Sequence, residues 1–463
     1  MRPFRHRTAM PAAQFFSALS CLEDYLSRYA RCKEAFPEHA RASPLRARRL
    51  LDRLGAPDGR FAVVRVVGTK GKGSTAAMLE AVLRAAGYRT GLYTSPHLHT
   101  PRERIRVNGF PIGRLDFAAG LRALLPELEE SLGWDIGPAT LFEGLTALAM
   151  AHFARQGVDV AVVEAGMGGR SDATHALRPV LTVLTPISLD HQGYLGETLE
   201  AIAQEKAGAI PEGGAVASAR QPPEAWEVVV AHALRVGATV HVAGESPVGT
   251  VGLAGRYQQE NARLAALAVE LLRAQGWAIP ERALREGLRA VCWPGRLEVV
   301  AGHPLTVVDG AHNPVAAAAL AVALREAGFL ERRPCALVVG ASADKDLVGL
   351  LRPLVPLVDL VLPTRAAHHR AVDECKLAAL VEGCGIPVWP MAPVSRALWE
   401  ARKWCGPKGF VCVTGSFFVV AEAREALGLA VREPWPEPAS SDLPGGHGRA
   451  IMPGNPAPPR GQS

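Results

Sequence analysis

One segment, VVGTKGKGSTAAMLEAVLRAAG (66–87), constrains the fold more than any other part of the chain. A Val-rich run leads into a glycine-rich turn, and the turn leads into an Ala- and Leu-rich stretch with helical patterning. Gly68, Gly71 and Gly73 let backbone N–H groups approach an anion closely, and a helix that begins near Ser74 would add the positive end of its dipole. The segment predicts a phosphate-binding loop between a strand and a helix. The strict GxxxxGK[ST] pattern is not met, so a tight turn without a ligand is the alternative.

Short Val-rich runs alternate with longer amphipathic stretches along most of the chain. Runs of this kind, bounded by Gly or Pro, are typical of parallel strands that are buried on both faces and joined by crossover helices. The first runs are FAVVRVVG (61–68), VDVAVVE (158–164) and VLTVLTPI (180–187). After a predicted helix at 257–275 the pattern restarts with LTVVDG (305–310), CALVVGA (335–341), LVDLVLP (357–363) and FVCVTGS (410–416). The predicted fold class is α/β.

The length of 463 residues is about three times that of a typical domain of about 150 residues. We predict an N-terminal α/β domain over residues 1–297, which begins with a helical segment, and a smaller α/β domain over residues 298–430. Residues 431–463 are rich in Pro and Gly and have no apolar periodicity. We predict that they form a disordered tail.

The carboxyl ends of three predicted strands carry oxygen or imidazole groups. Ser95 and His97 follow one strand, Glu164 ends the next before a second glycine-rich turn, and Asp190 and His191 follow the third. In open α/β sheets, ligands bind beyond these ends. A carboxylate, a hydroxyl and an imidazole beside nucleotide phosphates would form a Mg²⁺ site. Each group alone is a weak signal, but their joint placement behind a phosphate loop predicts such a site.

Composition and charge exclude several classes of protein. The net charge of +6 is mild for this length, aromatic residues make up only 6%, and no basic stretch is interleaved with aromatics, which argues against nucleic acid as a partner. No apolar run approaches the roughly 20 residues that span a bilayer. The eight cysteines show no CxxC pair and no zinc spacing, as expected in a reducing compartment. We expect a cytoplasmic monomer that binds neither nucleic acid nor membranes.

Twelve motifs, spread in order from about residue 20 to about residue 428, resemble those of the folylpolyglutamate synthase/dihydrofolate synthase family of the Mur-ligase superfamily. The N-terminal motifs are GTKGKGST (68–75), TSPHL (94–98), RERIRVNG (102–109), TLFE (140–143), EAGMGGRSDAT (164–174), LDHQGYLGET (189–198) and EKAGAI (205–210). The remaining motifs are GRYQQENA (255–262), WPGRLE (293–298), VVDGAHNP (307–314), GASADKD (340–346) and TGSFFVVAEA (414–423). No single motif is decisive, but all twelve occur in the order of the family.

The resemblance implies a P-loop-containing, Mur-ligase-like domain followed by a smaller Rossmann-like domain that closes over ATP. It also implies an ATP-dependent ligase. ATP would phosphorylate a carboxylate of a pterin-containing substrate, the amino group of L-glutamate would attack the acyl phosphate, and ADP and phosphate would be released. The leading hypothesis is a bifunctional enzyme that adds glutamate to dihydropteroate and to the γ-carboxylate of reduced folates.

By motif position, the resemblance implies roles for individual residues. The residues that would bind the phosphates of ATP are Gly71, Lys72, Gly73 and Ser74. Asn261 would contact adenine, Arg296 the phosphates and Asp309 the ribose. The ligands of two Mg²⁺ ions would be Ser95, Glu164, His191 and Lys206. The residues that would contact the pteroate are Thr140, Phe142, Glu143, Arg170 and Asp172. The residues closest to the chemistry would be Lys72, His191 and Lys206.

Simpler interpretations exist for several of these residues. Lys206 could be a solvated lysine paired with Glu205. The resemblance implies instead a partly buried amine of lowered pKa that reacts with CO₂, so that the resulting carbamate oxygens bind the second Mg²⁺. Arg296 could form an interdomain ion pair, and Asn261 could cap a helix turn.

Three features depart from the family pattern. Lys70 stands where bacterial members often have Asn, and Ser171 and His175 stand where Leu and Asn are usual. Residues 31–55 lack a stretch that helps the family to hold dihydropteroate. Polyglutamylation alone is therefore an alternative to the bifunctional activity. A cell-wall Mur ligase and a nucleotide-binding regulator are further alternatives, but the first would need an additional N-terminal acceptor domain, and the second would release no ADP in response to substrate.

Overall fold

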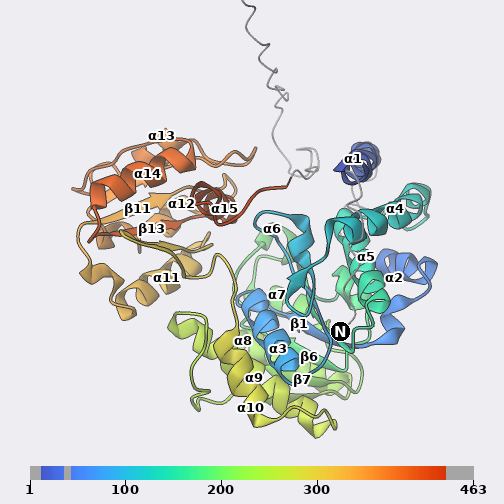
Figure 1. Ribbon diagram of the computed structural model, residues 1–463. Helices are drawn as coiled ribbons and strands as arrows, with labels where there is room; N and C mark the ends of the chain where they lie inside the picture. Colours follow the sequence, from blue (N-terminus) through green and yellow to red (C-terminus); the bar gives the residue numbers. More distant parts are fainter. Residues whose placement is uncertain (1–11, 36–42, 434–463) are drawn as a thin grey trace, which may run out of the picture.

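The computed structural model describes residues 12–35 and 43–433, and it contains two sheets flanked by helices (Figure 1). The first sheet has eight strands in the order β4-β3-β2-β5-β1-β6-β7-β8, and the second has five in the order β12-β11-β13-β10-β9. Strands β2, β5, β1, β6, β7 and β8 are parallel, whereas β3 and β4 are antiparallel. The predicted α/β fold class is confirmed.

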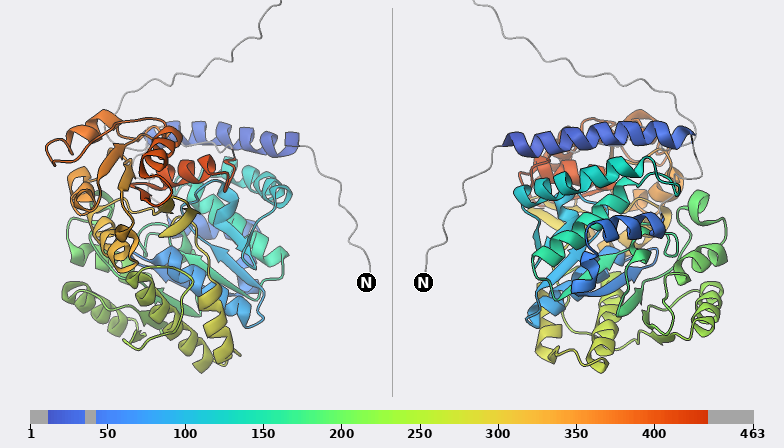
Figure 2. Two further views of the ribbon diagram at one scale, coloured as in Figure 1. Left: turned by 60° about the vertical axis from the view of Figure 1, so that its left-hand side comes forward. Right: turned by 90° about the vertical axis from the view of Figure 1, so that its right-hand side faces the viewer.

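The elements of the N-terminal part, up to residue 297, are as follows. Its strands are β1 (Ala62–Val67), β2 (Thr90–Tyr93), β3 (Ile105–Val107), β4 (Phe110–Pro111), β5 (Val160–Glu164), β6 (Leu181–Leu184), β7 (Ala215–Ser218) and β8 (Thr239–Val242). Its helices are α1 (Ala12–Ala35), α2 (Pro44–Arg53), α3 (Lys72–Ala85), α4 (Arg114–Ser131), α5 (Leu141–Arg155), α6 (Gln192–Leu195), α7 (Leu199–Ala207), α8 (Pro223–Arg235), α9 (Arg256–Ala274) and α10 (Glu281–Ala290). Helix α1 lies along the outside of α4 (Figure 2).

Strand β1 lies in the middle of the first sheet, and its residues face two layers of helices. Val64 and Val66 pack in a cluster with residues of α3, α9 and α10. Val63 packs with residues of α4 and α5 on the other face, and Val67 packs with residues of α7 and α8. Fully burying one such side chain contributes about 1.5–3 kcal/mol. Burial on both faces explains why these runs are continuously apolar rather than alternating.

The elements of the C-terminal part, from residue 298, form a second and smaller layered unit. Its strands are β9 (Glu298–Gly302), β10 (Leu305–Val308), β11 (Cys335–Val339), β12 (Leu360–Pro363) and β13 (Phe410–Thr414). Its helices are α11 (Pro314–Glu326), α12 (Leu347–Leu351), α13 (Glu374–Ala379), α14 (Val394–Cys405) and α15 (Phe417–Ala426). The division into domains at residue 297 stays a prediction.

Helix α15 of the C-terminal part contacts the loop that follows β2. His99 Nδ1 lies 3.0 Å from Glu425 Oε1, and Arg424 Nε donates to His99 Nε2 over 3.2 Å. Arg424 is also paired with Glu298. The loop that begins with Ser95 is therefore held by charged groups of the C-terminal part.

Glu433 adds a second connection between the two parts. Its side chain is 6% exposed and accepts hydrogen bonds from Arg102 at 2.8 Å, from Arg114 at 2.6 Å and from Thr100. Its backbone N–H donates to His99 O over 3.1 Å. Residues 431–433 of the predicted tail are therefore placed in the structure, because three polar side chains hold the Glu433 carboxylate. The rest of the predicted tail, residues 434–463, lies outside the described residues.

Among the residues that the structure describes, no helix is long and apolar enough to span a bilayer.

Candidate active site

The phosphate loop predicted from the sequence connects β1 to α3. Gly71 precedes the first residue of α3 and has a φ of 80°, which is a left-handed conformation. A Cβ atom at Gly71 would also collide with the Asn261 side chain, and one at Gly68 would collide with Thr185. Backbone conformation and close packing thus both require glycine at these positions. The exposed N-terminus of a 14-residue helix follows directly, as phosphate binding requires.

Buried polar side chains that are hydrogen-bonded to one another pack against the phosphate loop. Asn261 and Gln258, one turn apart on α9, are joined by a hydrogen bond of 2.9 Å from Asn261 Nδ2 to Gln258 Oε1. Gln258 Nε2 in turn donates to Ser74 Oγ over 3.3 Å. Asn261 and Ser74 are 6% and 4% exposed. The structure thus brings Asn261 to the phosphate loop, whereas its predicted contact with adenine stays a prediction.

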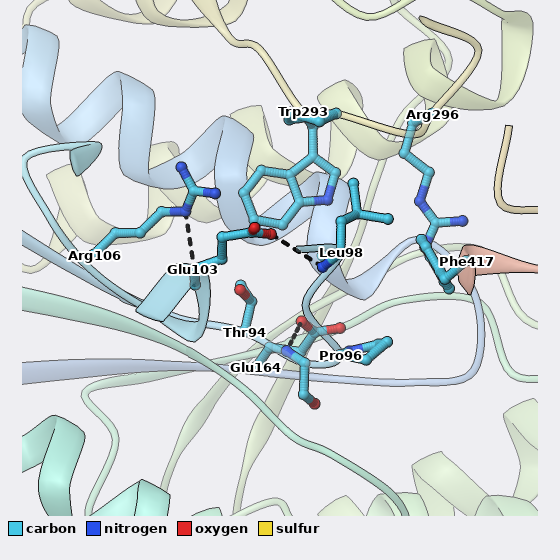
Figure 3. A pocket seen from close by; sticks show the side chains of 12 residues that line it. Thr94, Pro96, Leu98, Glu103, Arg106, Glu164, Trp293, Arg296 and Phe417 are labelled. Atoms are coloured by element: carbon cyan, nitrogen blue, oxygen red, sulfur yellow. Dashed lines mark hydrogen bonds between the residues drawn. The ribbon is translucent and has the colours of Figure 1, made fainter. Parts of the chain in front are cut away.

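A solvent-open pocket with an empty volume of about 480 Å³ lies beside the loop, between the two parts of the chain (Figure 3). Gly73, Ser95 and Glu164 line it from the N-terminal part, and Arg296 and Phe417 line it near the C-terminal part. In Figure 3 the Glu164 carboxylate lies at the floor, with Arg296 on one side and Trp293 above it. Three of the predicted phosphate and metal residues thus meet in one pocket with Arg296.

Glu164 ends β5 at the floor of this pocket. Its Oε2 atom accepts a hydrogen bond of 3.0 Å from the backbone N–H of Ser95, and its side chain is buried. Burial raises the pKa of Glu164, while the cations Lys72, Arg296 and Arg104 counteract this shift. A carboxylate that is buried beside the phosphate loop with these three cations around it is suited to hold a divalent ion in its deprotonated form.

A second, smaller pocket lies on the other side of Lys72. It has an empty volume of about 240 Å³, and it is lined by residues of the phosphate loop, of the second glycine-rich turn (166–168) and of the loop before α6. Lys72, His191 and Lys206 all line it. The four predicted metal ligands therefore divide into two pairs, Ser95 with Glu164 and His191 with Lys206, with the Lys72 region between them.

Lys206 is buried although it carries an amine. It lies on α7, is 3% exposed, and its Nζ donates a hydrogen bond of 2.8 Å to the carbonyl oxygen of Gly68. Burial, together with the charge of nearby Lys72, lowers the pKa of Lys206 to about 7. A lysine with this pKa is present as about half neutral amine at pH 7, and the neutral amine is the form that reacts with CO₂. The interpretation of Lys206 as a solvated lysine is therefore wrong.

These residues fit a divalent metal of the Mg²⁺ type. Within residues 12–35 and 43–433, no group of three or more His, Cys, Asp or Glu side chains is placed to hold a metal ion. The predicted set of metal ligands therefore depends on the Ser95 hydroxyl, on phosphate oxygens of the nucleotide and on the oxygen atoms of a carbamate on Lys206. Hard oxygen donors of this kind suit Mg²⁺, which keeps several non-protein ligands.

Asp309 and Arg296 stand where the C-terminal part begins. Asp309, at the end of β10, is 5% exposed, and its carboxylate accepts hydrogen bonds of 2.8 Å from the N–H groups of Leu297 and Ala311. Burial raises the pKa of Asp309, and Arg296 partly offsets the shift. The Arg296 guanidinium lies 4.6 Å from the centre of the Phe417 ring, a cation–π contact at the edge of the pocket. Arg296 thus faces the pocket, as predicted for a phosphate contact.

Two of the predicted pteroate contacts have structural roles instead. Thr140 and Glu143 form a capping box at the start of α5, with hydrogen bonds of 3.1 Å and 2.8 Å. Glu143 is fully buried and forms an ion pair of 3.0 Å with Arg46 of α2. We correct the prediction for Glu143, because both carboxylate oxygens are used within the protein and none of its surface is accessible. Phe142 stays accessible in part and lies against Gly166 of the second glycine-rich turn.

The second glycine-rich turn is held by two carboxylates. Asp172 is 1% exposed and accepts hydrogen bonds from Met167 N at 3.0 Å and from the hydroxyl of Thr174 at 2.6 Å. Glu205 accepts one of 2.6 Å from the Ser171 hydroxyl, so the serine that departs from the family pattern has a partner of its own. Arg170 is 72% exposed on its side chain. Of the two predicted pteroate contacts in this turn, only Arg170 is free to meet a ligand.

The sequence interpretation assigned no role to several residues of the site. Arg104 is half-buried and donates to His97 Nδ1 over 2.9 Å, and burial with this cation nearby lowers the pKa of His97 to about 3. Arg106 lies 5.4 Å from the Trp293 ring centre at the far end of the first pocket. The RERIRVNG motif contained both arginines, but nothing in the spacing indicated that Arg106 lines the pocket or that Arg104 contacts His97.

The comparisons with known proteins agree with this geometry. A family model described as "Mur ligase, glutamate ligase domain" matches residues 295–417. The chain is 33% identical over 419 residues to the dihydrofolate synthase/folylpolyglutamate synthase of Bacillus subtilis (strain 168), an alignment that covers 82% of this chain and 94% of that protein.

A second relative is longer than this chain. The identity is 39% over 416 residues to the probable bifunctional folylpolyglutamate synthase/dihydropteroate synthase of Haloferax volcanii, which covers 83% of this chain and 48% of that protein. The chain thus spans about half the length of this relative. Among solved structures, Mycobacterium tuberculosis folylpolyglutamate synthase complexed with ADP and AMPPCP matches with a TM-score of 0.77 and 33% identity, covering 91% of this chain and 100% of that chain.

Proposed function

The chain belongs to the folylpolyglutamate synthase/dihydrofolate synthase family, and we propose that it ligates L-glutamate to dihydropteroate and to the γ-carboxylate of reduced folates, with ATP as the energy source. The predicted family and its Mur-ligase-type fold are confirmed. The observation that carries the proposal is the position of Lys206, a buried amine that touches the phosphate loop beside Lys72 and His191. A turn that only connects β1 to α3 would not need a buried lysine with a lowered pKa.

The reaction requires two anions to meet. The γ-phosphate of ATP and the acceptor carboxylate repel each other, and the site must supply positive charge where they approach. Lys72 lines the second pocket, and its charge also acts on Glu164 of the first pocket, which Arg296 lines. We propose that Lys72 binds the β- and γ-phosphates of ATP and that Arg296 binds the phosphoryl group that is transferred. The acyl phosphate that forms is then attacked by the amino group of glutamate, and phosphate leaves.

Mg²⁺ ions would be held by Ser95, Glu164, His191 and Lys206 together with phosphate oxygens. When bound, Mg²⁺ neutralises developing charge on the phosphoryl group. Glu164 is prepared for this role by its hydrogen bond from Ser95 N, which fixes the carboxylate, and by the nearby cations, which counteract the rise in its pKa that burial causes.

Lys206 is proposed to act as a carbamate. The neutral amine attacks CO₂, a C–N bond forms, and one proton is released, so that a cation becomes an anionic group with two oxygen atoms. The lowered pKa favours this step because the amine need not first lose a proton to water. Nearby Lys72 would stabilise the resulting negative charge.

The C-terminal part is proposed to close over ATP and to carry the glutamate site. Asp309 at the end of β10 is assigned to the ribose and Asn261 to adenine. Closure around Arg296 and Phe417 would exclude water from the acyl phosphate. The groups that join α15 to the loop after β2 already connect the two parts on one side of the pocket.

The substrates that we propose are small molecules: dihydropteroate or a reduced folate, L-glutamate and ATP. We also propose a cytoplasmic monomer. The seven cysteines whose side chains the structure describes are all free, in accord with a reducing compartment. Gel filtration with light scattering would test the oligomeric state.

The two leading activities can be separated directly. Purified protein would be incubated with ATP, Mg²⁺, glutamate and either 7,8-dihydropteroate or tetrahydrofolate, and products would be identified by mass spectrometry. We expect dihydrofolate from the first and glutamylated folates from the second. If a product forms with tetrahydrofolate but not with 7,8-dihydropteroate, the enzyme has only the polyglutamylation activity. If neither substrate gives a product, the proposed function is contradicted.

A further inference from the structure

The second pocket contains a contact that the proposed chemistry does not use. Residues 69–70 of the phosphate loop lie against the loop that precedes α6. The backbone N–H groups of Thr69 and Lys70 both donate to Pro186 O, over 3.0 and 3.2 Å. Ser188 N also donates to Thr69 Oγ1 over 3.2 Å. These bonds secure the beginning of the loop, but they stop at residue 188.

The Lys70 side chain secures the end of the same loop. Lys70 Nζ lies 2.6 Å from Asp190 Oδ2, and the two side chains are only 26% and 13% exposed. The other oxygen of Asp190, Oδ1, accepts the backbone N–H of His191 over 3.1 Å and lies 3.9 Å from His191 Nε2. One carboxylate therefore joins the phosphate loop to the backbone of His191 and lies near its imidazole.

His191 needs such an anchor. Its φ is 52°, in the left-handed region, where a residue other than glycine is strained by about 1–3 kcal/mol. Its side chain is 44% exposed, so packing does little to fix the ring. The contacts of Asp190 replace that packing, and Asp190 keeps its own position through the charged hydrogen bond from Lys70.

We propose that Lys70 is a positioning residue for His191: its ammonium group anchors Asp190, and Asp190 holds the backbone of His191, whose side chain lines the second pocket, in the conformation needed at the metal site. The proposal rests on the proposed function in assigning His191 to the metal.

Two measurements test the proposal, and the first needs neither metal nor substrate. Amide hydrogen exchange of the free protein would be compared for the wild type, Lys70→Ala, Lys70→Asn and Lys70→Arg, with Lys408→Ala as a control that removes an exposed lysine elsewhere. We expect exchange at residues 189–195 to be about tenfold faster in the Ala and Asn variants. Exchange at Ser188, whose N–H is bound by Thr69, should be unchanged. The Arg variant, which keeps the charge, should resemble the wild type.

The second measurement is the binding of Mn²⁺ in the presence of ADP, followed by electron paramagnetic resonance. Loss of a group that orients a metal ligand weakens metal binding by about 10- to 100-fold, so the Ala and Asn variants should bind Mn²⁺ at least about tenfold more weakly than Lys408→Ala and Lys70→Arg. Thermal unfolding would confirm that each variant is folded, and the Asn and Arg variants decide the question if the Ala variant does not fold.

The outcomes are distinct. Unchanged exchange at residues 189–195 in the Ala and Asn variants would overturn the proposal, as would equal loss of Mn²⁺ binding in the Arg and Ala variants. A wild type that binds no Mn²⁺ would contradict the metal site of the proposed function, whereas the exchange comparison would still decide whether Lys70 anchors the loop.

Discussion

The Nζ atom of Lys206 lies 2.8 Å from the carbonyl oxygen of Gly68, which ties α7 to the first residue of the phosphate loop. The contact joins a buried amine to the segment that would bind the phosphates of ATP. It explains why α7, which follows β6, belongs to the site although no glycine-rich motif marks it. The pKa of Lys206 is also sensitive to charge at the loop, because after burial the charge of Lys72 is the main cause of its lowered value.

Replacement of Lys72 by Ala should remove the main positive charge between the two pockets. We expect kcat/KM for ligation to fall by about a thousandfold, within the range for loss of one group that stabilises a transition-state charge. The thermal midpoint should change little, because Lys72 is only partly buried and donates a weak 3.4 Å hydrogen bond to Thr69 O. Near-normal activity would refute the assignment of the phosphate loop.

Replacement of Lys206 by Ala should leave the enzyme nearly inactive, since the carbamate oxygens are lost. Small carboxylates such as formate or acetate should restore part of the activity, because they can occupy the space of the carbamate. Lys376→Ala, which removes an exposed lysine, serves as the control and should not respond to these anions. Failure of every carboxylate to rescue Lys206→Ala would count against the carbamate and leave the family assignment intact.

The lowered pKa of Lys206 predicts a specific pH dependence of stability. With a folded-state pKa of about 7 and an unfolded value near 10.4, the unfolded chain binds more protons between these limits. The free energy of unfolding should therefore rise with pH in that window, by up to about 1.4 kcal/mol per unit, and this contribution should be flat below pH 7. Lys206→Met removes the effect. Denaturant unfolding in CO₂-free buffer would give the free energy of unfolding of the wild type and of Lys206→Met between pH 7 and 10. The two curves should converge as the pH rises, and parallel curves would contradict the prediction.

The pairing of Glu433 with Arg102 and Arg114 should stabilise the arrangement of the two parts. Glu433→Gln keeps the shape and removes the charge, leaving Arg102 partly buried without its counter-ion. We expect a loss of about 2 kcal/mol in unfolding free energy, less than for a fully buried pair because Arg114 is exposed. Glu382→Gln, at an exposed position, is the control. An unfolding midpoint equal to that of the control would show that the pairing does not contribute.

The sequence predicts those features that are local in the chain. Strand β1, the phosphate loop and α3 are contiguous, and each of them follows from residue pattern and backbone conformation alone. The capping box of Thr140 and Glu143 was also visible in principle, because T-L-F-E has the spacing of that motif. The family resemblance led to the interpretation of these two residues as substrate contacts, whereas the local pattern favoured a helix cap.

Contacts between distant residues could not be predicted in this way. The partner of Glu143 is Arg46, 97 positions earlier in the chain, and the partners of Glu433 lie more than 300 positions away. Composition predicts a disordered segment over residues 431–463 because Pro and Gly dominate it, yet the Glu433 carboxylate is held by Arg102, Arg114 and Thr100. In the same way, Arg104 and His97 are seven residues apart, but only the folded loop brings them into hydrogen-bond contact.

The central claim is that the acceptor carboxylate is activated as an acyl phosphate, and oxygen transfer tests it most directly. A tetrahydrofolate labelled with ¹⁸O in its γ-carboxylate would be incubated with the enzyme, ATP, Mg²⁺ and glutamate, and the released phosphate would be examined by mass spectrometry. The account predicts one ¹⁸O atom in the phosphate for each glutamate added, because the bridging oxygen of the acyl phosphate leaves with phosphorus. Ligation that yields unlabelled phosphate would contradict it.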